Sequence, residues 1–185
     1  MNLSQLPNYL PAPIDDGAAN HLTGLSLPDI QLSATNGKLI QLNKLVGRYV
    51  IYIYPMTRQP NIALPDGWDS IPGARGCTPQ SCSFRDHADE LAILNTKIYG
   101  LSTQTTEYQL EVKNRLHLPF ELLSEASLEL KKSLKLPTFY VGNLELYKRL
   151  TMIIENNRII KTFYPVFPPN KNVDDVIEWL KTIAS

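Results

Sequence analysis

Two cysteines, Cys77 and Cys82, are the only thiols in the chain, and both lie in the short run of residues 76–86. The sequence predicts that this run opens a helix, after an apolar strand and a long loop. The start of a helix favours negative charge, and the thiolate is the form of cysteine that attacks electrophiles. The pair therefore predicts a redox enzyme in which one sulfur attacks and the other resolves.

The spacing of the two cysteines bears on whether they form a permanent disulfide. Five residues along a helix rotate the second side chain by about 140° and raise it by roughly 7.5 Å, which sets the two Cα atoms roughly 8–9 Å apart. A disulfide requires a Cα separation of about 4.4–6.8 Å. On an intact helix the bond forms only after the first turn unwinds, so a permanent structural disulfide is not expected. Two unrelated buried thiols are the alternative, because cysteine packs as a small hydrophobic residue.

Metal binding is not predicted for these sulfurs. Two cysteines on a helix need further ligands, and the three histidines, His21, His87 and His117, are scattered along the chain. The sequence indicates no bound cofactor. No role is assigned to His87 or His117, which are expected on a helix surface and in a turn.

The composition is that of an ordinary globular protein. The chain has 185 residues, of which 43% are hydrophobic and 19% charged, so one domain is the default. Its 18 basic residues balance its 18 acidic ones, so no overall field favours nucleic acid or an acidic membrane surface. No apolar stretch is long enough to span a bilayer, and the N-terminus does not resemble a signal peptide. A cytoplasmic location is therefore expected.

The chain divides into an N-terminal arm and one domain. Pro7, Pro11 and Pro13 break residues 1–22, which predicts an extended arm, and the domain covers residues 23–185. Strands are predicted at residues 27–32, 38–42, 49–54, 97–102, 139–141, 144–147, 151–155 and 158–163. Helices are predicted from Thr78 through Leu91, at 105–116, at 127–135 and from Asn172 onward. This order indicates a mixed α/β fold with a central sheet flanked by helices.

The connection between residues 55 and 76 is long and rich in Pro, Gly and Asp. A loop of this length inside a compact domain is usually functional. Thr78 is a good N-cap for the helix that follows, and Pro79 suits its first position. Phe84, Ala88 and Leu91 are spaced to form one helical face.

These residues resemble the peroxiredoxins, and most closely the branch of the bacterioferritin-comigratory protein and peroxiredoxin Q. The resemblance covers roughly residues 25–180 and implies a thioredoxin-like fold. It is carried by Gly76-Cys77-Thr78 … Cys82-Ser83-Phe84-Arg85-Asp86, Tyr52-Ile53-Tyr54-Pro55, Gly100-Leu101-Ser102-Thr103, Leu118-Pro119-Phe120-Glu121-Leu122-Leu123-Ser124 and Arg149-Leu150-Thr151-Met152-Ile153-Ile154.

The resemblance implies a role for each member of the site. Cys77 attacks a peroxide as the thiolate and becomes a sulfenic acid, and Cys82 condenses with it to a disulfide. Thioredoxin or a similar dithiol then reduces the pair. Arg149 holds the thiolate and polarises the peroxide. The implied protein is a monomer or a homodimer.

The sequence departs from the family pattern just before Cys77. The family has Thr or Ser three residues before the attacking cysteine, where this chain has Ala74. An insertion of about fifteen residues separates Cys77 from the matching Pro55. Either Thr57 folds back and hydrogen-bonds the sulfur, or backbone N–H groups at the start of the helix do so. Pro72 is a competing candidate for shielding the sulfur, although the role of an ordinary turn proline is favoured for it.

Two other residues of the insertion are candidates for the site. Arg75 either adds positive charge near the sulfur or is a solvated loop residue. Trp68 either covers the pocket or anchors the loop by burial, and anchoring is favoured.

Two other functions stay open at this point. A thioredoxin-like disulfide oxidoreductase would have two residues between its cysteines and a proline where Thr151 stands. The other is a redox-sensing or copper-binding module on the same fold. The copper-binding version would need a downstream histidine ligand, and none follows His117.

Overall fold

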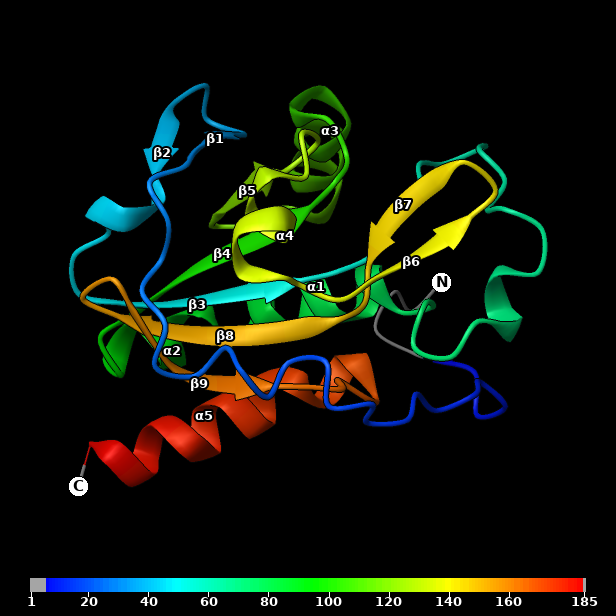
Figure 1. Cartoon of the computed structure of the whole chain (residues 1–185). Helices are drawn as coiled ribbons and strands as arrows, with labels where there is room; N and C mark the ends of the chain where they lie inside the picture. Colours follow the sequence, from blue (N-terminus) through cyan, green and yellow to red (C-terminus); the bar gives the residue numbers. More distant parts are fainter. Residues whose placement is uncertain (1–5, 185) are drawn as a thin grey trace.

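The computed structural model describes residues 6–184, and its centre is a seven-stranded mixed sheet (Figure 1). In order across the sheet the strands are β2 (Leu39–Gln41), β1 (Gln31–Ala34), β5 (Glu121–Ser124), β4 (Thr96–Ser102), β3 (Arg48–Ile53), β8 (Leu150–Glu155) and β9 (Arg158–Phe163). The predicted fold class is confirmed. The hairpin of β8 and β9 forms one side of the sheet, as the sequence indicates.

Strand β3 lies in the middle of the sheet, parallel to β4 and antiparallel to β8. Its run of β-branched and aromatic residues suits a strand buried on both faces. Val50 and Tyr52 point to one core, and Ile51 and Ile53 point to the other. Because β3 and β8 are paired from Arg48 to Ile53, the loops that follow β3 and precede β8 meet at the same end of the sheet.

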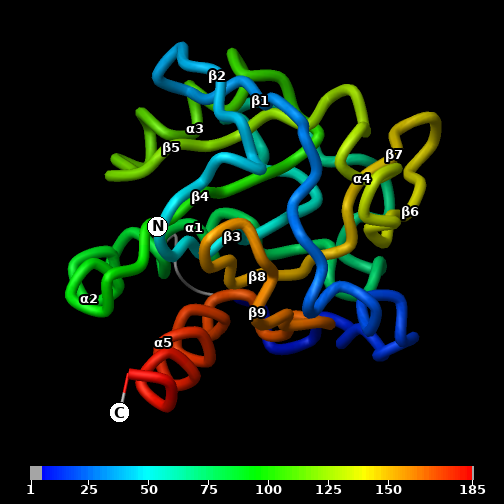
Figure 2. Tube along the Cα trace, turned by 60° about the vertical axis from the view of Figure 1, so that its left-hand side comes forward, coloured from blue at the N-terminus to red at the C-terminus, as the bar shows by residue number. Residues whose placement is uncertain are grey.

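Helices cover the two faces unequally (Figures 1 and 2). One face carries α1 (Cys77–Asp86), α2 (Ala88–Ile93), α3 (Thr106–Leu116) and α5 (Asn172–Ile183). The other carries the short helix α4 (Glu129–Leu134) and the chain before β1. Within residues 6–184, no helix is long and apolar enough to cross a lipid bilayer.

A separate hairpin packs against the inserted loop. Strands β6 (Thr138–Val141) and β7 (Leu144–Tyr147) form a two-stranded sheet. Trp68 of the loop is 3% exposed and lies in a small core with Leu146, its ring 6.2 Å from that of Phe139. Burial of this side chain therefore anchors the insertion to the hairpin, which is the favoured interpretation of Trp68.

The segment before β1 lies along the sheet without helix or strand. Ala19 and Leu22 are buried in the core on that face. The amide of Gly24 donates to the carbonyl of Ile159 at 2.8 Å, which ties the segment to β9. Residues 1–5 of the predicted arm lie outside the described residues, and the division into arm and domain stays a prediction.

Three elements of secondary structure differ from the sequence prediction. Strand β5 was not expected, because Leu122 and Leu123 are buried on opposite faces and the four residues show no alternation. The helix predicted through Leu91 ends at Asp86, and α2 begins after a break at His87. The first strand begins at Gln31, later than predicted.

Gly100 in β4 leaves room for the side chains of its paired residues on the neighbouring strands, Tyr52 of β3 and Leu122 of β5. A Cβ at this position would lie 2.5 Å from Leu122 Cδ2 and 2.7 Å from the Tyr52 ring. We expect Gly100→Ala to lower the free energy of unfolding by about 1–3 kcal/mol, measured by urea unfolding, because overpacking displaces buried side chains. In combination with Leu122→Ala, which removes one of the clashing groups, the loss should be smaller than the sum of the two single losses. An unchanged urea midpoint for Gly100→Ala would contradict this account.

Candidate active site

Cys77 is the first residue of α1, and its side chain is 3% exposed. Gly76 occupies the N-cap position with a φ of 114°, and a Cβ there would lie 2.8 Å from Pro169 Cγ. Glycine is therefore required both for the backbone conformation and for the contact. The predicted N-cap, Thr78, is wrong by two residues, because close packing at Gly76 starts the helix earlier than the local preference for threonine suggests.

Arg149 approaches Cys77 from the residue before β8 and is 3% exposed. Its Nη2 lies 3.2 Å from Cys77 Sγ and donates to the carbonyl of Ala74 at 3.0 Å. Its Nη1 donates to Gln80 Oε1 at 2.5 Å. The structure thus brings together Cys77 and Arg149, as predicted, with a fixed cation against the sulfur.

Gln80 links Arg149 to further buried polar groups, and the sequence did not predict it as a residue of the site. Its Nε2 donates to Asn172 Oδ1 at 3.0 Å, and the hydroxyl of Thr151 donates to the same oxygen at 2.7 Å. Gln80 therefore holds Arg149 on one side and the start of α5 on the other. The available signal was its spacing: Gln80 lies three residues after Cys77, on the same face of the helix.

Cys82 lies on the same intact helix and is fully buried. Both cysteines are free thiols. Burial raises the pKa of the Cys82 thiol, partly opposed by Arg85. The helical geometry expected from the spacing is confirmed, so a bond between the two sulfurs requires the first turn of α1 to unwind.

Thr57 lines the same cavity as Cys77 but bonds elsewhere. Its hydroxyl donates to Gln104 Oε1 at 3.1 Å, and its carbonyl accepts from Gln104 Nε2 and from the Tyr108 hydroxyl, each at 3.0 Å. These bonds fasten the start of the insertion to the region of α3. The hydrogen bond to the sulfur is not formed within the described residues, and a catalytic role for Thr57 stays a prediction.

A cavity of about 590 Å³ opens over Cys77. The insertion supplies much of its wall, including Trp68 and Arg75, so Trp68 borders the cavity as well as anchoring the loop. Arg75 forms an ion pair with Asp69 at 2.6 Å. Arg75 and Trp68, the two candidates from the insertion, therefore both line the same cavity as Cys77.

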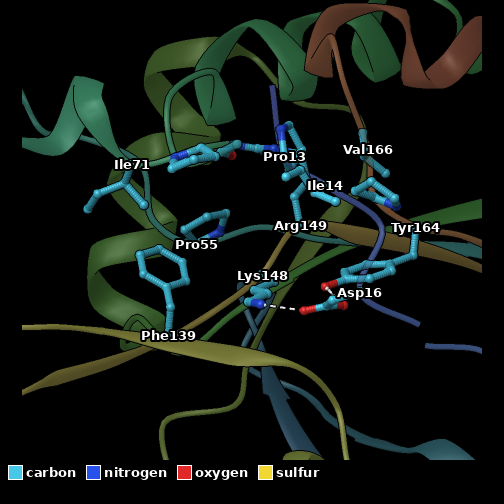
Figure 3. A pocket seen from close by; sticks show the side chains of 13 residues that line it. Pro13, Ile14, Asp16, Pro55, Ile71, Phe139, Lys148, Arg149, Tyr164 and Val166 are labelled. Atoms are coloured by element: carbon cyan, nitrogen blue, oxygen red, sulfur yellow. Dashed lines mark hydrogen bonds and ion pairs between the residues drawn. The ribbon is translucent and has the colours of Figure 1, made fainter. Parts of the chain in front are cut away.

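Arg149 lines a second cavity, of about 330 Å³, which is mostly apolar (Figure 3). Arg149 is not among the described residues that line the Cys77 cavity. Pro72 lines this second cavity and is absent from the described lining of the Cys77 cavity, so the structure gives no support for its shielding role. In its wall Lys148 Nζ lies 2.7 Å from Asp16, and the Tyr164 hydroxyl donates to Asp16 at 2.8 Å. These two bonds lower the pKa of Asp16 to about 2.

The histidines lie apart from the sulfurs. His87 Nδ1 lies 2.9 Å from the carbonyl of Ser83, and His117 ends α3 in a left-handed conformation. His21 Nε2 lies 2.8 Å from the carbonyl of Leu134. Among residues 6–184, no group of three His, Cys, Asp or Glu side chains is placed to hold a metal ion.

A family model described as Redoxin matches residues 22–177. The chain belongs to the redoxin family. It is 26% identical over 162 residues to chloroplastic peroxiredoxin Q of Oryza sativa subsp. japonica, covering 86% of this chain and 67% of that one. It is 28% identical over 160 residues to the Arabidopsis thaliana protein of the same name, covering 85% of this chain and 66% of that one.

A solved structure agrees with these relatives. The crystal structure of peroxidoxin BcpB from Mycobacterium tuberculosis aligns with a TM-score of 0.73 at 25% identity, over 89% of this chain and all of that one. This redoxin is therefore a peroxiredoxin of the peroxiredoxin Q and bacterioferritin-comigratory-protein type, as the sequence predicts. Such proteins are thiol-dependent peroxidases.

The contact between Gln80 and Arg149 gives a first prediction for this peroxiredoxin. In a Cys82→Ser background, Gln80→Leu should slow the oxidation of Cys77 by peroxide about tenfold, because a hydrogen bond that orients a buried cation is lost. Single-turnover kinetics followed by trapping of the sulfenic acid measure this rate. Ser83→Ala is the matched control on α1, since it removes a bond to the Asn170 carbonyl without touching Arg149. Equal rates for the two variants would contradict the positioning role of Gln80.

The burial of Cys82 gives a second prediction. Because the pKa of Cys82 is raised, its thiolate is scarce at neutral pH, and iodoacetamide should label Cys77 before Cys82 in the reduced, folded protein. Labelling of Cys82 should rise as pH exceeds about 9, where an ordinary cysteine ionises. Trypsin releases both cysteines in residues 76–85, and tandem mass spectrometry separates the two positions. Protein unfolded in urea, in which the two should react alike, is the control; faster labelling of Cys82 in the folded protein would contradict the prediction.

Proposed function

We propose that this protein reduces hydrogen peroxide or small organic hydroperoxides through a Cys77 sulfenic acid and a Cys77–Cys82 disulfide, which a thioredoxin-type dithiol reduces. The observation that carries the proposal is the 3.2 Å contact between Arg149 Nη2 and Cys77 Sγ. A buried guanidinium at this distance stabilises negative charge on the sulfur. It also lies where charge develops when a peroxide bond breaks beside Cys77.

In the first step the Cys77 thiolate attacks the terminal oxygen of the peroxide. The S–O bond forms as the O–O bond breaks, and the leaving oxygen departs with the electron pair and takes up a proton to give water or an alcohol. Arg149 Nε is buried and has no hydrogen-bond partner within the described residues. It is a donor that a peroxide oxygen can use.

In the second step Cys82 condenses with the sulfenic acid. The S–S bond forms as the S–O bond breaks, and water leaves with the proton of Cys82. This step requires α1 to unwind, because both sulfurs lie on the folded helix. An external dithiol then attacks the disulfide and restores both thiols.

A cytoplasmic location and a monomeric or homodimeric state are proposed from the sequence alone. Thioredoxin is proposed as the reductant on the family resemblance. All three are open to measurement by fractionation, by light scattering and by the coupled assay described next.

The coupled assay measures peroxide consumption with thioredoxin, thioredoxin reductase and NADPH. Wild type should turn over, Cys77→Ser should show none, and Cys82→Ser should be oxidised once without turnover. Arg149→Lys should lose about a hundredfold in the first oxidation, because a lysine cannot replace the planar guanidinium in its several contacts.

The same assay can refute the proposed cycle. Turnover by Cys77→Ser, or none by wild type with any dithiol, would refute the peroxidase cycle. Thr57→Val tests the role predicted for Thr57, with Gln104→Leu as the matched control because it breaks the same hydrogen bond. A greater loss in Thr57→Val than in Gln104→Leu is expected if the hydroxyl acts on the peroxide.

A further inference from the structure

The cavity over Cys77 has a concentration of positive charge. Three arginines line it, namely Arg58, Arg75 and Arg115, and the described lining contains no aspartate or glutamate. The chain as a whole has no net charge. The three arginines are therefore a local feature of this cavity, and their net positive charge depends on the acidic partners that they have outside the lining.

The three guanidinium groups differ in their partners. Arg75 is paired with Asp69 at 2.6 Å and Arg115 with Glu111 at 2.7 Å. A guanidinium carries five N–H donors, so one carboxylate does not use all of them. Arg58 is exposed and forms no ion pair with the described acidic residues, which makes it the cation best able to receive a ligand.

The backbone at Arg58 is held in place although its side chain is exposed. Arg115 Nη2 donates to the carbonyl of Arg58 at 2.9 Å. The preceding residue, Thr57, is bound on both its hydroxyl and its carbonyl by Gln104. Because these contacts fix the base of the side chain, Arg58 belongs to the wall of the cavity.

The cavity is much larger than hydrogen peroxide needs. Its volume of about 590 Å³ lies within the range of about 300–1,000 Å³ that is usual for sites of small organic ligands. A water molecule, close in size to hydrogen peroxide, occupies about 30 Å³. Met56, Leu64 and Trp68 give the cavity an apolar wall, which suits an organic body.

We propose that this cavity selects organic hydroperoxides that carry a carboxylate, with Arg58 as a specificity-determining residue. The inference rests on the proposed function, since it names the substrate class of the same thiol. The carboxylate lies against Arg58, the organic body contacts the apolar wall, and the peroxide group reaches Cys77. The carboxylate takes no part in the chemical step, in which the same S–O bond forms and the same O–O bond breaks.

The test compares two hydroperoxides that differ by one carboxylate group: cumene hydroperoxide and its 4-carboxylate. The ratio of kcat/KM for the carboxylate to kcat/KM for the neutral compound is measured in wild type and in Arg58→Gln. We expect Arg58→Gln to lower this ratio about fivefold, the size of one partly exposed ion pair. Added salt should lower the wild-type ratio, because screening acts on the charged substrate alone.

Arg158→Gln is the matched control, since Arg158 is an exposed arginine at the opposite end of the sheet, where β9 begins. Its ratio should equal that of wild type. An unchanged ratio in Arg58→Gln, with both substrates consumed, would overturn the specificity while leaving the peroxidase intact. A higher KM for the dithiol with an unchanged ratio would assign Arg58 to reductant docking and overturn it as well. Consumption of hydrogen peroxide but of neither organic hydroperoxide would also overturn the specificity. Failure to consume any of the three peroxides would instead refute the proposed function.

Discussion

The guanidinium of Arg149 is the point on which the site depends. A buried cation is costly unless acceptors surround it, and here the cation and its acceptors come from three parts of the chain. The carbonyl of Ala74 belongs to the end of the insertion, Gln80 and Cys77 belong to α1, and Arg149 itself is fixed by the pairing of β8 with β3. The cation therefore holds the loop, the helix and the sheet in one arrangement, with the sulfur at its centre.

The insertion forms a large part of the surroundings of Cys77. Its start is fastened through Thr57 and Gln104, and its middle through Trp68 against the β6–β7 hairpin. Its end supplies the carbonyl of Ala74 that Arg149 requires. The segment is thus tied down at both ends and in the middle, which allows it to form a defined wall around Cys77.

The sequence predicts the parts of this site that depend on local pattern or on family motifs. The central strand, the β8–β9 hairpin, the two cysteines and Arg149 were all found in this way. Strand β5 was missed because it is short and buried on both faces. The start of α1 was misplaced because the close packing of Gly76 against Pro169, more than ninety residues later, outweighs the capping preference of Thr78.

The hydrogen bonds that orient the site were harder to predict. Gln80 meets Arg149 and Asn172, and Thr57 meets Gln104, each across a long separation in the sequence. Side-chain partners of this kind are set by how the elements pack, which no local pattern encodes. The sequence therefore indicates the candidate catalytic residues better than it indicates the residues that hold them in place.

The intact helix that separates the two sulfurs has a thermodynamic consequence for the proposed cycle. Contacts such as that between Gln80 and Asn172, and that between Ser83 and the Asn170 carbonyl, hold α1 folded in the dithiol form. The disulfide form, in which α1 is unwound, lacks these contacts. They therefore stabilise the dithiol form and, by linkage, raise the reduction potential of the pair. For this two-electron couple about 1.4 kcal/mol corresponds to about 30 mV. The packing of α1 thus makes the disulfide easier for an external dithiol to reduce.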